Sequence, residues 1–285
     1  MGWRQHKLFQ LVWRISNLLL IASVLVSLYG LGWEFSVRRY LKGFSDAIVP
    51  ATATPEQKVQ YILDWMRVGP PRAVSADPSD LSRRDPETTL NYEQLLNVCG
   101  TATNAFLNLA RSSGLQARRL LLLTTERTTM HVVAEVLIQD RWVIVDPTYR
   151  VIPRDAQGRM LTRTDLQDPA TFSQAINRIK GYPPEYTFQT VAHVRLARFV
   201  PHRFGLRKFL DSIYPGWDAA AYWSLLLERE SLFFLCAALF TTFLLFLWRS
   251  GLAWYADKRL KLPRIRLRQK AVRAGVALFS PPEIK

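Results

Sequence analysis

Two long apolar segments divide the chain. Residues 15–33 and 231–248 contain no charged side chain, whereas charged residues flank both segments. A helix that crosses a membrane needs roughly 17–25 predominantly apolar residues, and Trp and Tyr side chains gather near the segment ends, as they do at membrane surfaces. The pattern favours two membrane-spanning helices. A cleaved signal peptide is the alternative for the first segment, and a buried core helix is the alternative for the second.

Between these segments, apolar residues recur first at helical spacing and then at strand spacing. One helix is expected to begin with Thr54 as its N-cap and Pro55 as its first residue. Another is expected to begin near Cys99 and to stop at Gly114. Strands are expected over residues 117–123, 131–138 and 141–146. The expected apolar faces of the two helices comprise Val59, Ile62, Leu63, Met66, Ala102, Ala105, Phe106, Leu109 and Ala110.

The pattern after residue 150 is weaker. A short helix is expected around residues 172–179. Residues 191–200 fit a strand or a helix, and residues 205–217 fit a helix on the membrane surface or an ordinary domain helix.

Positive charge is concentrated at the two ends of the chain, and the net charge is +15. Cytoplasmic flanks of membrane helices are enriched in Lys and Arg. We therefore expect residues 1–14 and 249–285 to be cytoplasmic, and residues 34–230 to form an exported domain with a core over about 54–150 and a C-terminal extension. The basic tail is expected to contact anionic lipid rather than to bind nucleic acid, the other reading of such a tail.

The chain has two cysteines. Cys236 lies inside the second apolar segment, where packing is its expected role, so Cys99 is the single thiol of the exported domain. Disulfide scaffolds use even numbers of cysteines, and the spacing of Cys and His matches no zinc site. We expect neither a metal nor another cofactor.

One hairpin is expected to bring a histidine and an aspartate together. If Gln139 and Asp140 form a two-residue turn, Val133 lies opposite Asp146, and His131 lies two positions along the same face. Such diagonal neighbours are about 7–8 Å apart along the backbone, a gap that side chains bridge. A three-residue turn with a bulge would change the register and separate them.

These three residues suit thiol chemistry. The thiolate is the reactive form of cysteine, and a helix N-terminus favours it at Cys99. An imidazole at His131 can hold the proton and later deliver it to a leaving group, while Asp146 orients the imidazole and stabilises its cation. Taken singly, each residue has an ordinary structural interpretation, namely a small buried thiol, a satisfied histidine and a turn-forming aspartate.

The order and context of these residues resemble the bacterial transglutaminase-like superfamily. The resemblance rests on "VCGTATNAFLNLARSSGLQAR" around Cys99, "MHVVAEV" around His131 and "RWVIVDPTY" around Asp146. It implies an α+β, papain-like fold with a Cys-bearing helix on an antiparallel sheet, and a Cys99–His131–Asp146 triad. It makes Gln94 a candidate oxyanion donor, with a surface amide as the alternative. Glu135 shares the face of His131 and either tunes the imidazole or pairs with an arginine.

The resemblance implies acyl transfer through a Cys99 thioester, with water or an amine as acceptor. The expected substrate is a peptide, a protein or peptidoglycan at the cell envelope, and the expected location is a bacterial inner membrane with a periplasmic domain, beside membrane-protein partners. The alternative is a non-catalytic, membrane-anchored binding or scaffold module of an envelope or exopolysaccharide assembly system.

Overall fold

The computed structural model describes residues 7–68, 90, 98–126, 128–193, 212–213 and 229–260. The chain forms two compact units: residues 1–30 with 235–285 make the first, and residues 31–234 make the second. The second unit contains the sheet and all three residues of the expected triad.

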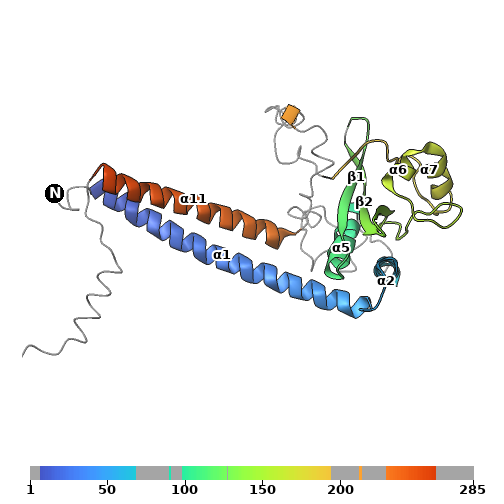
Figure 1. Cartoon of the computed structure of the whole chain (residues 1–285), viewed down its shortest axis with the longest axis horizontal. Helices are drawn as coiled ribbons and strands as arrows, with labels where there is room; N and C mark the ends of the chain where they lie inside the picture. Colours follow the sequence, from blue (N-terminus) through green and yellow to red (C-terminus); the bar gives the residue numbers. More distant parts are fainter. Residues whose placement is uncertain are drawn as a thin grey trace, which may run out of the picture. The chain divides into compact units, whose positions relative to one another are not determined.

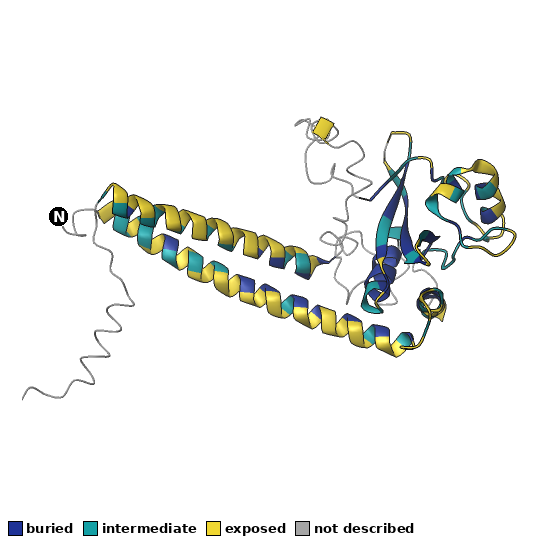
Figure 2. Ribbon diagram, in the orientation of Figure 1, coloured by how far each residue is buried: buried dark blue, intermediate teal, exposed yellow. Residues whose placement is uncertain are grey.

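Two helices are long and apolar enough to span a membrane, α1 (Lys7–Ile48) and α11 (Glu230–Lys258). Within the first unit they lie side by side (Figure 1), and the hydroxyl oxygens of Ser27 and Thr242 are 3.0 Å apart. Arg249 lies over the ring of Trp13 and donates a 2.6 Å hydrogen bond to Asn17. Large apolar side chains cover the outer faces of both helices, which are largely exposed (Figure 2).

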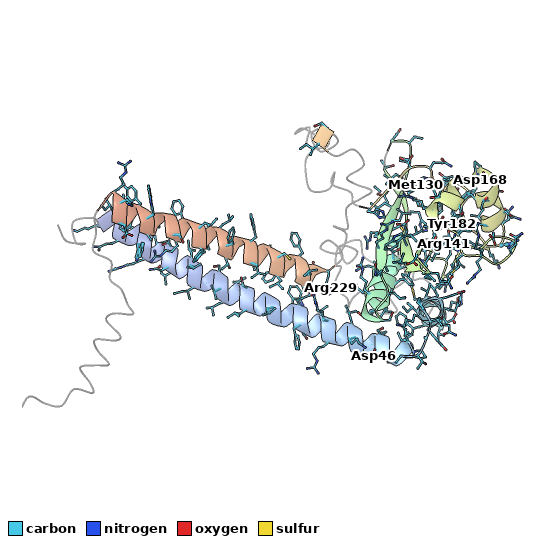
Figure 3. All side chains as sticks on the ribbon, viewed as in Figure 1. Asp46, Met130, Arg141, Asp168, Tyr182 and Arg229 are labelled. Carbon is cyan, nitrogen blue, oxygen red and sulfur yellow. The ribbon has the colours of Figure 1, made fainter. Side chains whose placement is uncertain are left out.

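Helix α1 extends well beyond the apolar segment at 15–33, because its last turns belong to the core of the domain. Val37 and Leu41 are buried there, and the hydroxyl of Ser45 donates to the carbonyl of Leu109 at 3.4 Å. Glu34, which ends the apolar segment, is also buried. Its carboxylate accepts hydrogen bonds from Arg229 at 2.8 Å, Ser231 at 2.7 Å and Arg38 at 2.6 Å (Arg229 is labelled in Figure 3).

The domain is built on an antiparallel four-stranded sheet with the strand order β3-β2-β1-β4. The strands are β1 (Ala117–Leu123), β2 (Thr129–Ile138), β3 (Arg141–Val145) and β4 (Val191–Ala192). The fold is α+β, as expected. The predicted strands from 117 to 146 are confirmed to within two residues at each end.

Alternating strand residues supply the cores on the two faces of the sheet. Ala134, Val136 and Val145 face α2 (Pro55–Val68), α5 (Cys99–Ser112) and the end of α1. Val133 and Ile144 face a second cluster that includes α6 (Arg163–Gln167) and α7 (Pro169–Ile176). Figures 1 and 2 show α5 against the strands, with buried residues along the contact.

Both helices predicted before the sheet are confirmed. The buried face of α2 consists of the predicted residues, and Gly114 ends the region of α5 with a φ of 85°, a conformation that glycine adopts without strain. The helix predicted around 172–179 begins earlier, at Pro169, because Asp168 caps it. Two segments had two expected assignments each. In the first, residues 191–192 form the strand β4, and residues 194–200 lie outside the described residues. Most of the second, 205–217, also lies outside them.

The hairpin register is the predicted one. The ladder runs from Ile138 opposite Arg141 to Ala134 opposite Val145. Gln139 and Asp140 have φ values of 49° and 60°, as the two central residues of a type I′ turn require. Asp146 then leaves the ladder and pairs with Val151 instead, so the expected pair of Val133 with Asp146 does not form.

We expect Leu41→Ala to destabilise the domain by about 2–5 kcal/mol, because it leaves a cavity at a fully buried site. The control is Leu31→Ala on the same helix, at a leucine that is 56% exposed. The measurement is the urea unfolding midpoint of the full chain in detergent, followed by tryptophan fluorescence. Equal midpoints for the two variants would show that the end of α1 is not part of the domain core.

Candidate active site

Cys99 is the first residue of α5. Val98 before it is extended, with φ −132° and ψ 159°, and the side chain of Thr101 accepts a hydrogen bond from the N–H of Val98 at 3.2 Å. Thr103 ties the helix to β2 by donating to the carbonyl of Val132 at 2.9 Å. The thiol is partly exposed and packs beside apolar residues of β1, β2 and β4. It therefore sits at a helix start, where the helix dipole favours an anion.

His131 and Asp146 are in direct contact. Nε2 of His131 lies 2.8 Å from Oδ2 of Asp146, and both residues are buried. The other carboxylate oxygen, Oδ1, accepts the backbone N–H groups of Thr148 at 3.0 Å and Tyr149 at 3.2 Å. Because the turn after β3 supplies these donors, it helps to fix the carboxylate in the orientation that faces the imidazole.

The thiol and the imidazole each change the pKa of the other. Burial by itself lowers the pKa of His131, but the hydrogen bonds with Asp146 and then with Cys99 outweigh it and raise the pKa to about 9. Burial by itself raises the pKa of the Cys99 thiol, but the hydrogen bond and the charge of His131, together with the N–H of Val132, lower it overall. Both shifts favour a thiolate beside an imidazolium.

Since Nε2 of His131 faces Asp146, Nδ1 is the ring nitrogen left for Cys99. The β2 strand carries an irregularity immediately before His131, where Leu122 pairs with His131 but Leu123 pairs with Thr129. Met130, labelled in Figure 3, is the extra residue. Such a bulge bends a strand locally and redirects the next side chain.

Three tyrosines surround His131, and the sequence patterns pointed to none of them. The ring of Tyr186 stacks on the imidazole with centroids 4.3 Å apart and an angle of 9°. Tyr149 and Tyr182 approach edge-on, at 6.0 Å and 6.3 Å. Burial raises the pKa of Tyr182, and the nearby carboxylate of Asp146 raises it further, so the phenol stays neutral.

The structure describes one of the other two candidate residues, Glu135, but not Gln94. Glu135 pairs with an arginine, the second of its two expected roles. Its carboxylate accepts from Nε of Arg118 at 2.6 Å and lies 3.6 Å from Nε2 of His193. Gln94, the candidate oxyanion donor, lies outside the described residues. Within the described ranges, no group of three or more His, Cys, Asp or Glu side chains is arranged to hold a metal ion.

Residues 42–147 match the sequence model of the transglutaminase-like superfamily, which identifies this part of the chain as a transglutaminase-like domain. The matched region contains Cys99, His131 and Asp146, whereas α6, α7, β4 and the residues Tyr182 and Tyr186 follow it. No curated protein and no solved structure matches the chain.

His131→Ala is expected to raise the pH at which Cys99 reacts with iodoacetamide toward about 8.5, the value of an unperturbed thiol, because it removes the cation beside the sulfur. Asp146→Asn should have an intermediate effect, since it leaves the imidazole in place. The full chain carries Cys236→Ala so that Cys99 alone is labelled. His193→Asn is the control, because its amide can still bond to the carbonyl of Arg119, as Nδ1 of His193 does. An unchanged profile in His131→Ala would mean that the thiol and the imidazole do not interact.

Proposed function

We propose that this protein is a membrane-anchored thiol enzyme that transfers acyl groups from amide or peptide bonds through a thioester on Cys99. The observation that carries the proposal is the hydrogen bond between His131 and Asp146 within a transglutaminase-like domain, together with a Cys99 thiol whose pKa His131 lowers. The two helices that are long and apolar enough to span a membrane support the anchoring.

The reaction follows from the positions of the three side chains. The Cys99 thiolate attacks the carbonyl carbon of the substrate, and the negative charge that develops on the carbonyl oxygen is favoured near the start of α5. When the tetrahedral intermediate collapses, the C–N bond breaks and the imidazolium of His131 gives its proton to the leaving amine. The thioester remains on Cys99, and His131 is neutral.

The neutral imidazole then takes a proton from the acceptor as that acceptor attacks the thioester. Water as acceptor releases a carboxylic acid, and an amine forms a new amide. In both cases Cys99 leaves as the thiolate and His131 returns to its cationic form. Asp146 keeps its charge throughout and stabilises the imidazolium.

The substrate class we propose is a peptide, a protein or peptidoglycan at the cell envelope. The support for this class is the combination of an amide-directed thiol with an anchor, since an anchored domain reaches only substrates near the membrane surface. The basic residues that follow the second apolar segment favour a cytoplasmic tail and hence a domain on the opposite, periplasmic side of a bacterial inner membrane.

Incubation of the full chain with envelope extract should yield an acyl adduct on Cys99, detected as a mass increase that neutral hydroxylamine removes, because hydroxylamine cleaves thioesters. Cys99→Ala should abolish the adduct without loss of fold, and Cys236→Ala should retain it. The mass of the acyl group identifies the substrate. A chain with an activated thiol that acquires no adduct from any envelope fraction would instead support a binding or scaffold module.

Reporter fusions test the orientation. A fusion at Arg84 should give the signal of an exported reporter, and a fusion at Lys285 that of a cytoplasmic one, because of the charge bias across the two apolar segments. A fusion after Thr54 serves as a second exported point. An exported signal at Lys285 would contradict the proposed topology.

A further inference from the structure

After α7 the chain runs back to the sheet and packs against His131. Tyr182 and Tyr186 are half-buried there, and Phe188 is buried in the core beneath α6 and α7. Tyr186 stacks on the imidazole with ring centroids 4.3 Å apart, while the ring of Tyr182 meets the imidazole edge-on at 6.3 Å. We call residues 182–188 the tyrosine segment (Tyr182 is labelled in Figure 3).

The tyrosine segment is held by several contacts. The N–H of Tyr186 donates to the carbonyl of Pro183 at 3.2 Å, and the N–H of Tyr182 donates to that of Ile179 at 3.2 Å. Gln167 at the end of α6 donates to the carbonyl of Phe188 at 3.3 Å. Since Phe188 is 1% exposed, the segment is anchored at both ends, and the Tyr186 ring has a fixed place over the imidazole.

We propose that Tyr186 is a positioning residue, whose ring face holds His131 in the charged form and in the orientation that serves Cys99. This rests on the proposed function, because it assigns Tyr186 a role in activating that thiol. Residues 182–188 lie beyond the part of the chain that matches the transglutaminase-like family, so the role belongs to the C-terminal extension of this domain.

The physical reason is the charge distribution of the ring. The face of an aromatic ring is electron-rich and attracts a cation within about 6 Å of its centroid, and the imidazole centroid lies within that distance. The parallel stack also restricts tilting of the imidazole plane, which keeps Nε2 directed at Asp146 and Nδ1 at Cys99. Tyr182 contributes separately, because its ring meets the imidazole edge-on, with centroids 6.3 Å apart and an interplanar angle of 89°.

Substitutions at Tyr186 separate the ring face from simple burial. Leucine keeps an apolar side chain over the imidazole but has no π face, whereas phenylalanine keeps the face and loses only the hydroxyl. In the full chain with Cys236→Ala, Tyr186→Leu should shift the iodoacetamide profile of Cys99 to higher pH and slow the reaction at pH 7 by about twofold to tenfold. Tyr186→Phe should retain the original profile. Tyr61→Leu, at a 43% exposed tyrosine of α2, is the matched control.

Compared with Tyr186→Phe, a fluorinated phenylalanine at position 186 gives the same test with little change of shape, and so covers the case in which Tyr186→Leu fails to fold. Fluorine withdraws electron density from the ring face, so the profile should move in the direction expected for leucine. The proposal is overturned if the leucine or fluorinated variant, correctly folded, keeps the profile of the unsubstituted chain, or if Tyr186→Phe behaves like Tyr186→Leu.

The outcomes distinguish this proposal from the proposed function. A profile that depends on the ring face, in a chain that forms no acyl adduct, would keep the role of Tyr186 and reject the acyl-transfer reaction. An adduct on Cys99 with a profile that is independent of Tyr186 would keep the reaction and reject the positioning role.

Discussion

The two-residue turn at Gln139 and Asp140 is the constraint on which the candidate site depends. Because side chains alternate between the faces of a strand, a shift of one residue in this hairpin would send His131 and Asp146 to opposite faces. Both turn residues adopt positive φ values, at 49° and 60°, an uncommon conformation for a residue such as glutamine. The hydrophobic cores on both sides of the sheet resist such a slip, since it would exchange Val133 and Ala134 between them.

Local patterns were sufficient to predict the helix that begins at Cys99 and the three strands, because these depend on short-range spacing. They also predicted the contact between His131 and Asp146, because it depends on a single turn. The tyrosines were beyond such reasoning. Tyr186 contacts His131 because the chain after α6 and α7 turns back onto the sheet, and no periodicity in the sequence encodes that return. The five-residue helix α6 is also too short for a periodic signal, although Thr162 and Asp165 form a capping box at its start.

Glu34 is a second feature whose role the sequence pattern did not predict. Glu34 marks a boundary by composition, yet it is buried within the domain unit, where Arg229 and Ser231, 195 and 197 residues further along the chain, donate hydrogen bonds to it. A buried carboxylate without partners would be strongly destabilising, whereas the three donors to Glu34 offset much of the cost of burying its charge. The network therefore fixes how the start of α11 meets α1 within this unit, and α1 continues from there to bring Leu41 into the core.

The site combines a buried imidazole with a partly exposed thiol. His131 and Asp146 are shielded from water by the tyrosines, so their attraction is stronger than in solvent, while Cys99 remains open to a substrate. Because the pKa of His131 is raised from about 6.5 to about 9, the contribution of the imidazolium to stability is fully present below about pH 6.5 and is lost as pH rises through about 9. The lowered pKa of Cys99 acts in the opposite direction, since the contribution of the thiolate is lost as pH falls. The attraction between the thiolate and the imidazolium is counted once and is confined to the interval in which Cys99 and His131 together hold a single proton. The part of the His131 contribution that comes from Asp146 does not depend on the thiolate.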